Sequence, residues 1–363
     1  MSASSTVTVT GMCRNRNRDG KRVRMRTLYI LAEDTRDLIY GPTERAAIGR
    51  LVDVMAPPLT RETIRENGSL LADVEVLFSG WGGAVMDSAF LAAAPSLRAV
   101  FYGAGTTGYI TPDAFWERGI VLTSAVVANS QPVAEYTLGV ILLSLKQFWK
   151  LAALAQAGGD WYDPCRHQLA GAHRSTVGLI SLGTIGRMVA ARLRAFDVRV
   201  LAFDPYVLEE DCRALGVQKS SLRDLFRHSD VVTLHAPSRA ETWAMVNGEL
   251  LLSMKPGATF INTSRGGVVN QPELVEVLRR RPDLTAVLDV LEPEPPSPDA
   301  PILSLPNAVV TPHIAGSLGP ECRRMGQCMV EELQRYLAGQ PLRWQVHPPP
   351  RVSSLVSTAG QLN

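Results

Sequence analysis

The sequence contains few cysteines, and their spacing does not suit cross-linking or metal binding. Five cysteines are scattered over 363 residues without any Cys-x-x-Cys spacing. Neither a disulfide framework nor a cysteine zinc site is therefore indicated, and a reducing, cytoplasmic compartment fits this composition. The six histidines show no paired ligand spacing either. We therefore predict no metal centre.

Long apolar runs and a hydrolase motif are also missing. The longest apolar run, YTLGVILLSL over residues 136–145, is followed by Lys146. It is much shorter than the roughly 20 residues that span a bilayer, so we expect no membrane anchor. No Gly-x-Ser-x-Gly nucleophile elbow occurs. Its absence disfavours a serine hydrolase.

The charges nearly balance, because the formal net charge is +2, and the basic excess lies in one segment. Seven arginines and lysines fall between Arg14 and Arg26, with only Asp19 to offset them. The rest of the chain is mildly acidic, so nucleic-acid binding would depend on this arm alone and is not expected. We interpret residues 1–26 as a disordered basic leader, whose Arg and Ser content also resembles a transit peptide. Residues 346–363 are expected to be a flexible tail.

Length and patterning predict two α/β domains. A chain of 363 residues is longer than most chains that fold around a single hydrophobic core. Strand-like and helix-like runs alternate from residue 28 to about 123, and again from residue 176 to 315. This alternation predicts two Rossmann-like, doubly wound parallel-sheet domains, separated by a cleft. An amphipathic helix that follows Gly319 and ends at Gly339 is expected to return to the first domain and make it discontinuous.

The expected substrate domain therefore comprises residues 27–128 and 318–345, and the expected coenzyme domain comprises residues 129–317. Near the start of the second domain lies QPVAEYTLGVILLSLKQFWK, residues 131–150, which is apolar on nearly every side. Such a helix is typical of a domain or subunit interface. We expect it to contribute to a homodimer contact.

Two glycine-rich loops compete for a dinucleotide. The fingerprint requires a strand before the glycines, a helix at the last glycine, and an acid about 20 residues further on. SLGTIG, residues 181–186, meets all three requirements, because Asp204 ends the next strand-like run. The pyrophosphate would bind at the helix N-terminus, where backbone N–H groups favour negative charge. Asp204 repels a 2′-phosphate, which predicts NAD rather than NADP.

Ser181 departs from the fingerprint, because it stands where the pattern has its first glycine. We expect a cost of about 1 kcal/mol and weaker binding rather than none. YGAGTTG, residues 102–108, matches the letters, but Pro112 delays the next helix and the following strand ends without an acid. This loop is interpreted as an anion site for substrate, with the backbone N–H groups of Ala104, Gly105 and Thr106 as donors. A turn that needs glycine only for its backbone angles is the alternative.

Three polar residues each follow a strand-like run: Arg265, Glu294 and His313. The carboxyl ends of parallel strands meet at one edge of a sheet, so the three side chains are expected to converge. Arg265 offers a bidentate fork for a carboxylate or a keto oxygen. His313 can exchange a proton near neutral pH. Glu294, hydrogen-bonded to His313, would orient the ring and favour its protonated form.

Four stretches together resemble the D-isomer-specific 2-hydroxyacid dehydrogenase family: TVGLISLGTIG, SDVVTLHAPSRAETWAMVNGELLLSMKPGATFINTSRGGVVN, LDVLEPEP and NAVVTPHIAG. The resemblance covers roughly residues 70 to 340. It implies NAD(H)-dependent interconversion of a small D-2-hydroxy acid and its 2-keto acid, in a homodimer built on the coenzyme domain. It also implies that Arg265, Glu294 and His313 have the roles given above.

The resemblance further implies a set of coenzyme contacts. Thr184 and Ile185 would cover the pyrophosphate, and Asp289 would hold the nicotinamide carboxamide. With the residues of the fingerprint, the full set of expected coenzyme-binding residues is Gly183, Thr184, Ile185, Gly186, Asp204, His235, Pro237, Thr242, Thr263, Ser264 and Asp289.

The departures from the family concern the substrate. Thr107 and Gly108 stand where the family usually has Asp or Asn, and the loop FSGWGG around Trp81 carries no basic residue. A phosphorylated substrate is therefore disfavoured, and a small or apolar 2-hydroxy or 2-keto acid is predicted, with Trp81 either as a pocket wall or as plain packing. Two alternatives stay open: an NAD(H)-sensing protein similar to corepressors of this fold, and a dehydrogenase of an unusual oxyanion. Glu294 weighs against formate.

Overall fold

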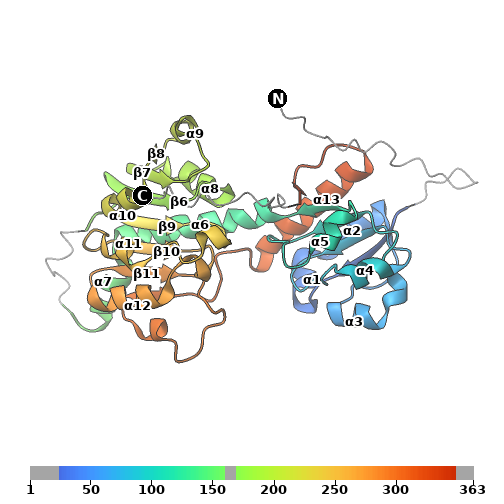
Figure 1. Ribbon diagram of the computed structural model, residues 1–363, viewed down its shortest axis with the longest axis horizontal. Coiled ribbons are helices and arrows are strands. Elements are labelled where there is room, and N and C mark those ends of the chain that lie inside the picture. Colours follow the sequence, from blue (N-terminus) through green and yellow to red (C-terminus); the bar gives the residue numbers. More distant parts are fainter. Residues whose placement is uncertain (1–23, 160–168, 349–363) are drawn as a thin grey trace, which may run out of the picture. The chain divides into compact units, whose positions relative to one another are not determined.

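The computed structural model describes residues 24–159 and 169–348, and the chain divides into two compact units. The first unit is formed by residues 1–128 and 319–363, and the second by residues 129–318. Each unit contains one sheet with helices on both faces (Figure 1). The first unit is therefore built from two separate stretches of chain. Most of the expected leader and tail lies outside the described residues.

The sheet of the first unit has the spatial order β13-β5-β4-β3-β1-β2. Its strands are β1 (Arg26–Ile30), β2 (Asp53–Val54), β3 (Val76–Ser79), β4 (Ala99–Tyr102), β5 (Val121–Ser124) and β13 (Gln345–Val346). Strands β1 to β5 pair in parallel, whereas β13 pairs antiparallel with β5. The chain direction across the sheet reverses between β1 and β3, so a ligand is expected beside the carboxyl ends of these two strands.

Helices cover both faces of this sheet. One face packs against α1 (Glu33–Ile39), α2 (Pro42–Leu51) and α13 (Cys322–Leu337), and the other packs against α3 (Arg61–Glu66), η1 (Gly68–Leu71), α4 (Ser88–Ala93) and α5 (Asp113–Glu117). The core of this unit contains stacked aromatic rings. The ring centroids of Phe78 and Phe101 are 5.2 Å apart. Helix α13 returns to this sheet and is followed by Gly339, whose φ of 65° suits a helix stop.

Three details of the first unit differ from the sequence prediction. Strand β1 begins at Arg26, inside the range expected to be leader. Asp53 and Val54 end a helix-like run of sequence, residues 43–54, but they form β2, because Val52 has already left the helix with φ −131°. Strand β13 was not predicted, and its antiparallel pairing with β5 corrects the expectation of a wholly parallel sheet. A strand of two residues is too short to show an alternating pattern.

The sheet of the second unit has the spatial order β12-β11-β10-β9-β6-β7-β8, and all its pairs are parallel. Its strands are β6 (Ser175–Ile180), β7 (Val198–Phe203), β8 (Gln218–Lys219), β9 (Val231–Leu234), β10 (Thr259–Asn262), β11 (Thr285–Leu288) and β12 (Ala308–Val310). The sequence pattern did not indicate the short edge strand β8. The direction reverses between β6 and β9, as in a dinucleotide-binding fold.

The helices of the second unit also form two layers. One layer contains α6 (Val126–Leu145), α8 (Thr184–Leu193) and α9 (Glu209–Ala214), and the other contains α10 (Leu222–His228), α11 (Gly248–Leu252) and α12 (Gln271–Arg280). Short 3-10 turns are η3 (Ala240–Thr242), η4 (Gly266–Val268) and η5 (Pro301–Ser304), and η6 (Gly319–Glu321) precedes α13.

The apolar segment 131–150 is not the single helix that its composition predicts. It divides into α6 and α7 (Phe148–Gln156), because Gln147 takes a left-handed conformation with φ 45°. Among the described residues no single helix is long and apolar enough to cross a membrane; α6 and α7 pass that test only as a pair, bent by 60° at the break.

Candidate functional site

The loop between β6 and α8 has the backbone geometry of a dinucleotide fingerprint. Ser181 has φ 76°, so the first fingerprint position takes the left-handed conformation that glycine normally supplies. Gly183 is the N-cap of α8, and a Cβ built there would meet only the Ser181 hydroxyl, at 4.0 Å. At Gly186 a Cβ would lie 2.1 Å from the Ser181 carbonyl oxygen. The three positions thus serve a tight turn, an open approach and close helix–strand packing.

Asp204 joins the end of β7 to this loop. Its Oδ2 accepts a hydrogen bond from the Leu182 amide at 2.8 Å, and its Oδ1 accepts from the amides of Tyr206 at 2.9 Å and Val207 at 3.2 Å. A carboxylate has roughly four acceptor positions, so three bonds leave capacity for a ribose hydroxyl. Asp204 therefore both braces the glycine loop and fits its expected role.

His235 lies beside the same loop, directly after β9. Its Cδ2 is 3.8 Å from the position that a Cβ at Gly186 would take, and its Nε2 lies 3.3 Å from the Thr233 hydroxyl. Burial lowers the pKa of His235 to about 3, so the ring is neutral at physiological pH. Its Nδ1 is buried without a hydrogen-bond partner within the described part of the chain. Such an atom, beside an open glycine cradle, fits a bound dinucleotide.

The other expected coenzyme residues also follow strands of this sheet. Thr184 and Ile185 open α8, while the Thr242 hydroxyl donates to the Pro237 carbonyl at 2.6 Å. After β10, the Thr263 hydroxyl lies 3.1 Å from the hydroxyl of Thr137, and the Ser264 hydroxyl donates to Asn262 Oδ1 at 2.9 Å. The family resemblance named these residues but did not predict these hydrogen bonds.

The structure brings His313 and Glu294 together. Their Nδ1 and Oε1 atoms are 2.5 Å apart, which confirms the hydrogen bond expected between them. Both side chains are partly exposed, at 45% and 39%. His313 has φ 52°, an uncommon conformation for a residue with a Cβ. The ring is therefore oriented by a carboxylate on one of its nitrogens.

Arg265 lies on a loop that packs tightly against the segment leading to Glu294. A Cβ at Gly266 would come within 2.0 Å of the Leu291 carbonyl carbon, so only glycine permits this approach. The Arg265 Nη1 donates to the Ser264 carbonyl at 2.6 Å, and the Arg265 carbonyl accepts from Asn262 Nδ2 at 3.0 Å. The first contact turns the guanidinium back onto the main chain of its own loop, and the second fixes that loop against Asn262.

Asp289 has contacts that its sequence context did not reveal. Its Oδ1 accepts from the Thr311 hydroxyl at 2.6 Å and from the Ile314 amide at 2.8 Å, and its Oδ2 accepts from the Ala315 amide at 2.9 Å. The carboxylate expected to hold a carboxamide thus also binds the loop that carries His313. The spacing of residues in the sequence does not indicate these hydrogen bonds, because Thr311, Ile314 and Ala315 lie in the loop after the neighbouring strand, β12.

The expected substrate residues belong to the first unit. Trp81 follows Gly80, the first residue after β3, at the point where the sheet reverses, and it packs partly buried against both cores. Its carbonyl accepts from the Ala32 amide at 2.8 Å, after β1. The Ser124 hydroxyl lies 3.0 Å from the Ala104 carbonyl and 2.6 Å from that of Gly105. Thr106 is exposed in the same loop.

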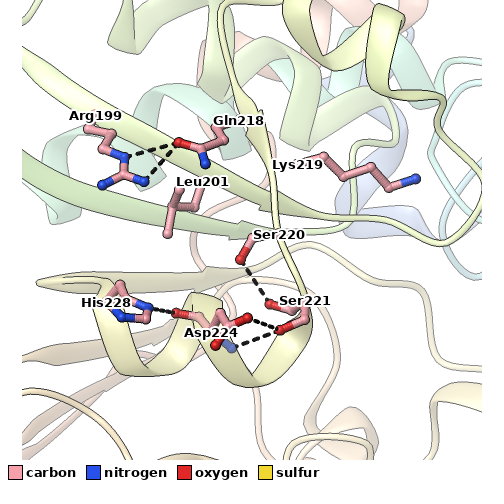
Figure 2. A pocket seen from close by; sticks show the side chains of 8 residues that line it. All are labelled: Arg199, Leu201, Gln218, Lys219, Ser220, Ser221, Asp224 and His228. Atoms are coloured by element: carbon pink, nitrogen blue, oxygen red, sulfur yellow. Dashed lines mark hydrogen bonds between the residues drawn. The ribbon is translucent and has the colours of Figure 1, made fainter. Parts of the chain in front are cut away.

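A cavity of about 450 Å³ lies elsewhere in the second unit, between the edge strand β8, its neighbour β7 and helix α10 (Figure 2). Its polar lining is largely internally bonded, because Arg199 donates twice to Gln218 Oε1, and Ser221 donates to Asp224 Oδ2. Lys219 donates to the Val207 carbonyl. None of the expected site residues lines this cavity. Within the described ranges no group of three or more His, Cys, Asp or Glu side chains could hold a metal ion.

The fold and the glycine loop of the second unit define a nucleotide-binding α/β protein. Residues 138–315 match the model for the NAD-binding domain of D-isomer specific 2-hydroxyacid dehydrogenases. The chain is also 35% identical over 256 residues to (S)-sulfolactate dehydrogenase of Chromohalobacter salexigens, a match that covers 69% of this chain and 81% of that protein. The chain belongs to the D-isomer-specific 2-hydroxyacid dehydrogenase family, and it has an NAD-binding domain.

Two further similarities agree with this membership. The chain is 34% identical over 257 residues to D-3-phosphoglycerate dehydrogenase of Mycobacterium leprae, covering 70% of this chain but 48% of that relative, so it spans about half of that protein's length. A crystal structure of D-lactate dehydrogenase from Aquifex aeolicus, complexed with NAD and lactic acid, superposes with a TM-score of 0.67 at 26% identity. It covers 86% of this chain and 96% of that one.

Ser181 provides a test of the glycine loop. Because its φ is 76°, replacing Ser181 by glycine is expected to relieve about 1 kcal/mol of backbone strain and to raise NADH affinity about threefold. Isothermal titration calorimetry and urea unfolding measure the two quantities. The matched control is Ser220→Gly, on the edge strand side of the domain, where no positive φ is relieved. Equal effects of the two substitutions would show that strain at Ser181 does not limit binding.

Proposed function

We propose that this protein is an NAD(H)-dependent oxidoreductase that interconverts a D-2-hydroxy acid and its 2-keto acid. The observation that carries the proposal is the His313–Glu294 pair, held 2.5 Å apart on the carboxyl edge of the same sheet that bears the glycine loop. Family membership and the fit of the loop to a dinucleotide agree with it.

The chemistry of His313, Glu294 and Arg265 suits a different role for each side chain. NAD, when bound, supplies the acceptor or donor of hydride. His313 takes the hydroxyl proton in oxidation and returns it in reduction, and Glu294 keeps its ring oriented and stabilises the charged form. Arg265 binds the carboxylate or the keto oxygen through its planar fork and polarises the carbonyl in reduction. We assign no step to a metal ion.

NAD is preferred over NADP because Asp204 stands at the ribose position. Its carboxylate, 7% exposed and already holding three backbone amides, cannot turn away from an incoming 2′-phosphate. The expected holders of the rest of the coenzyme are Gly183, Thr184, Ile185, Gly186, His235, Pro237, Thr242, Thr263, Ser264 and Asp289.

A small or apolar keto acid suits the first unit. Trp81 lies at the reversal point of the sheet, and its loop brings no basic residue for a phosphate. Backbone N–H groups of Ala104, Gly105 and Thr106 are proposed to bind the substrate carboxylate.

The cysteines Cys212, Cys322 and Cys328 are thiols rather than disulfides, which agrees with a cytoplasmic location.

The test is oxidation of NADH and NADPH against a panel of 2-keto acids: glyoxylate, pyruvate, hydroxypyruvate, phenylpyruvate, branched-chain acids and phosphonate analogues. We expect turnover with NADH of a 2-keto acid whose side chain carries no phosphate. Tight NADH binding without turnover of any acid would contradict the enzyme proposal and favour the NAD(H)-sensing alternative. Reduction of NAD by an oxyanion in a separate assay, without turnover of any keto acid, would favour a dehydrogenase of an unusual oxyanion.

We also propose a homodimer through the NAD-binding domain. None of the nine residues of α7 is buried although the helix is mostly apolar, and Phe148 and Leu143 are 48% and 41% exposed. An apolar surface of this kind is typical of a subunit interface. In sedimentation velocity we expect a dimer for the wild type and a shift to monomer for Phe148→Asp. Leu208→Asp, at the exposed N-cap of α9, is the control. A monomeric wild type at micromolar concentration would refute the dimer.

A further inference from the structure

The loop that carries His313 is held in an unfavourable conformation by bonds from several directions. His313 has φ 52°, which costs about 1–3 kcal/mol for a residue with a Cβ and persists only where the surroundings determine it. The His313 amide donates to the Asp289 carbonyl at 3.0 Å, and the amides of Ile314 and Ala315 donate to the Asp289 carboxylate at 2.8 and 2.9 Å. The loop therefore follows the position of Asp289.

Helix α6 reaches this arrangement at two points. The Tyr136 hydroxyl lies 3.0 Å from the Thr311 hydroxyl, and Asn129 Oδ1 accepts from the Ser317 amide at 3.0 Å. Seven residues, or about two turns, separate Tyr136 from Asn129, so both point from one face of α6 and lie about 10 Å apart along its axis. One helix thus holds the beginning and the end of the loop 311–317.

The hydrogen bonds between Tyr136, Thr311 and Asp289 have a defined direction. A carboxylate only accepts, so the Thr311 hydroxyl must give its single proton to Asp289 Oδ1, at 2.6 Å. The Thr311 oxygen then accepts, and Tyr136 is the donor. Burial raises the pKa of Tyr136 above its ordinary value, so the hydroxyl keeps the proton that it donates. The chain of bonds runs from α6 to the carboxylate under His313.

We propose that Tyr136 is a positioning residue for His313, acting through the Thr311 hydroxyl and the Asp289 carboxylate. The proposal rests on the function proposed above, in which His313 exchanges the substrate proton. Tyr136 touches neither His313 nor Glu294 in any hydrogen bond of the described chain. Its effect is therefore to fix where the loop presents the imidazole, which matters most in the transition state.

The experiment compares Tyr136→Phe, Thr311→Val and Thr311→Ser with the wild type. Tyr136→Phe removes one hydroxyl and is expected to lower kcat about three- to tenfold, with KM for NADH unchanged. Thr311→Val removes the middle of the chain of bonds and should lower kcat at least as much. Thr311→Ser keeps the hydroxyl and should restore most of it. Tyr29→Phe, which removes a buried hydroxyl in the first unit, is the control and should leave kcat unchanged.

A double variant distinguishes this positioning role from a general loss of stability. In the Thr311→Val background Tyr136 has lost its acceptor, so adding Tyr136→Phe should change kcat by less than about twofold. Two independent effects on folding would instead multiply. Melting temperatures measured for all variants, including Tyr29→Phe, show whether loss of folded protein accounts for the decrease.

Amide hydrogen exchange tests the positioning without any turnover. The amides of Ile314 and Ala315 should exchange faster in Tyr136→Phe and Thr311→Val than in the wild type, in Thr311→Ser and in Tyr29→Phe. If the wild type reduces no keto acid, the proposed function fails, and faster exchange still supports the role of Tyr136. Unchanged exchange overturns the inference, and so does faster exchange with unchanged kcat in an active enzyme.

Discussion

His313→Ala is expected to lower kcat for keto-acid reduction by about 10²- to 10⁴-fold, because it removes the group that delivers the proton. NADH affinity should stay close to that of the wild type. The alanine lacks the 2.5 Å contact with Glu294, but the loop keeps its three bonds to Asp289 from Thr311, Ile314 and Ala315. Steady-state kinetics and a fluorescence titration with NADH measure the two quantities on the same preparation.

The control for this substitution is His228→Ala. His228 bonds through Nδ1 to the Asp224 carbonyl in α10 and lines the cavity of Figure 2, away from the glycine loop. Its loss should leave kcat unchanged. Glu294→Gln keeps a hydrogen-bond partner for His313 without its charge, and an intermediate loss is expected. A kcat that survives His313→Ala, or a pH profile of kcat/KM with the same limbs as the wild type, would exclude His313 as the acid and base.

Local spacing explains why much of the second unit was predictable. The glycine loop, α8 and Asp204 fall within one strand–helix–strand unit, so their relation depends on short chain lengths that the sequence shows directly. The His313–Glu294 contact follows from a second rule, since both residues lie beyond the carboxyl ends of adjacent parallel strands β11 and β12. The fingerprint has a glycine where this chain has Ser181, so the sequence also indicates a positive φ and backbone strain at that residue.

Other features depend on contacts that no short pattern records. Tyr136 and Thr311 are 175 positions apart, and the bracing role of Asp289 requires the path of the loop after β12. The break at Gln147 carries no proline or glycine to mark it; it appears only as a positive φ between α6 and α7. The paired strands β2, β8 and β13 have two residues each, so their assignment depends on their neighbours.

Two glycines of the cofactor loop should differ in their effect on stability when each is replaced by alanine. At Gly186 the new methyl would lie 2.1 Å from the Ser181 carbonyl oxygen, a backbone atom that no side-chain rotation can move away. We expect Gly186→Ala to lower the free energy of unfolding by about 3 kcal/mol without any ligand, as overpacking does, and to abolish tight NADH binding. Urea unfolding in the absence of NADH measures the first effect.

Gly183→Ala should leave the folded protein intact and still lose NADH affinity. Its φ of −68° and ψ of −162° are open to alanine, and the nearest atom to the added Cβ is 4.0 Å away. The change at this N-cap should cost less than about 1 kcal/mol of stability. Because this open space is where a pyrophosphate would approach the helix N-terminus, the methyl should weaken NADH at least about tenfold in calorimetry. If Gly183→Ala bound NADH like the wild type, the dinucleotide would have to lie elsewhere, and the assignment of Asp204 and His235 to it would fail as well.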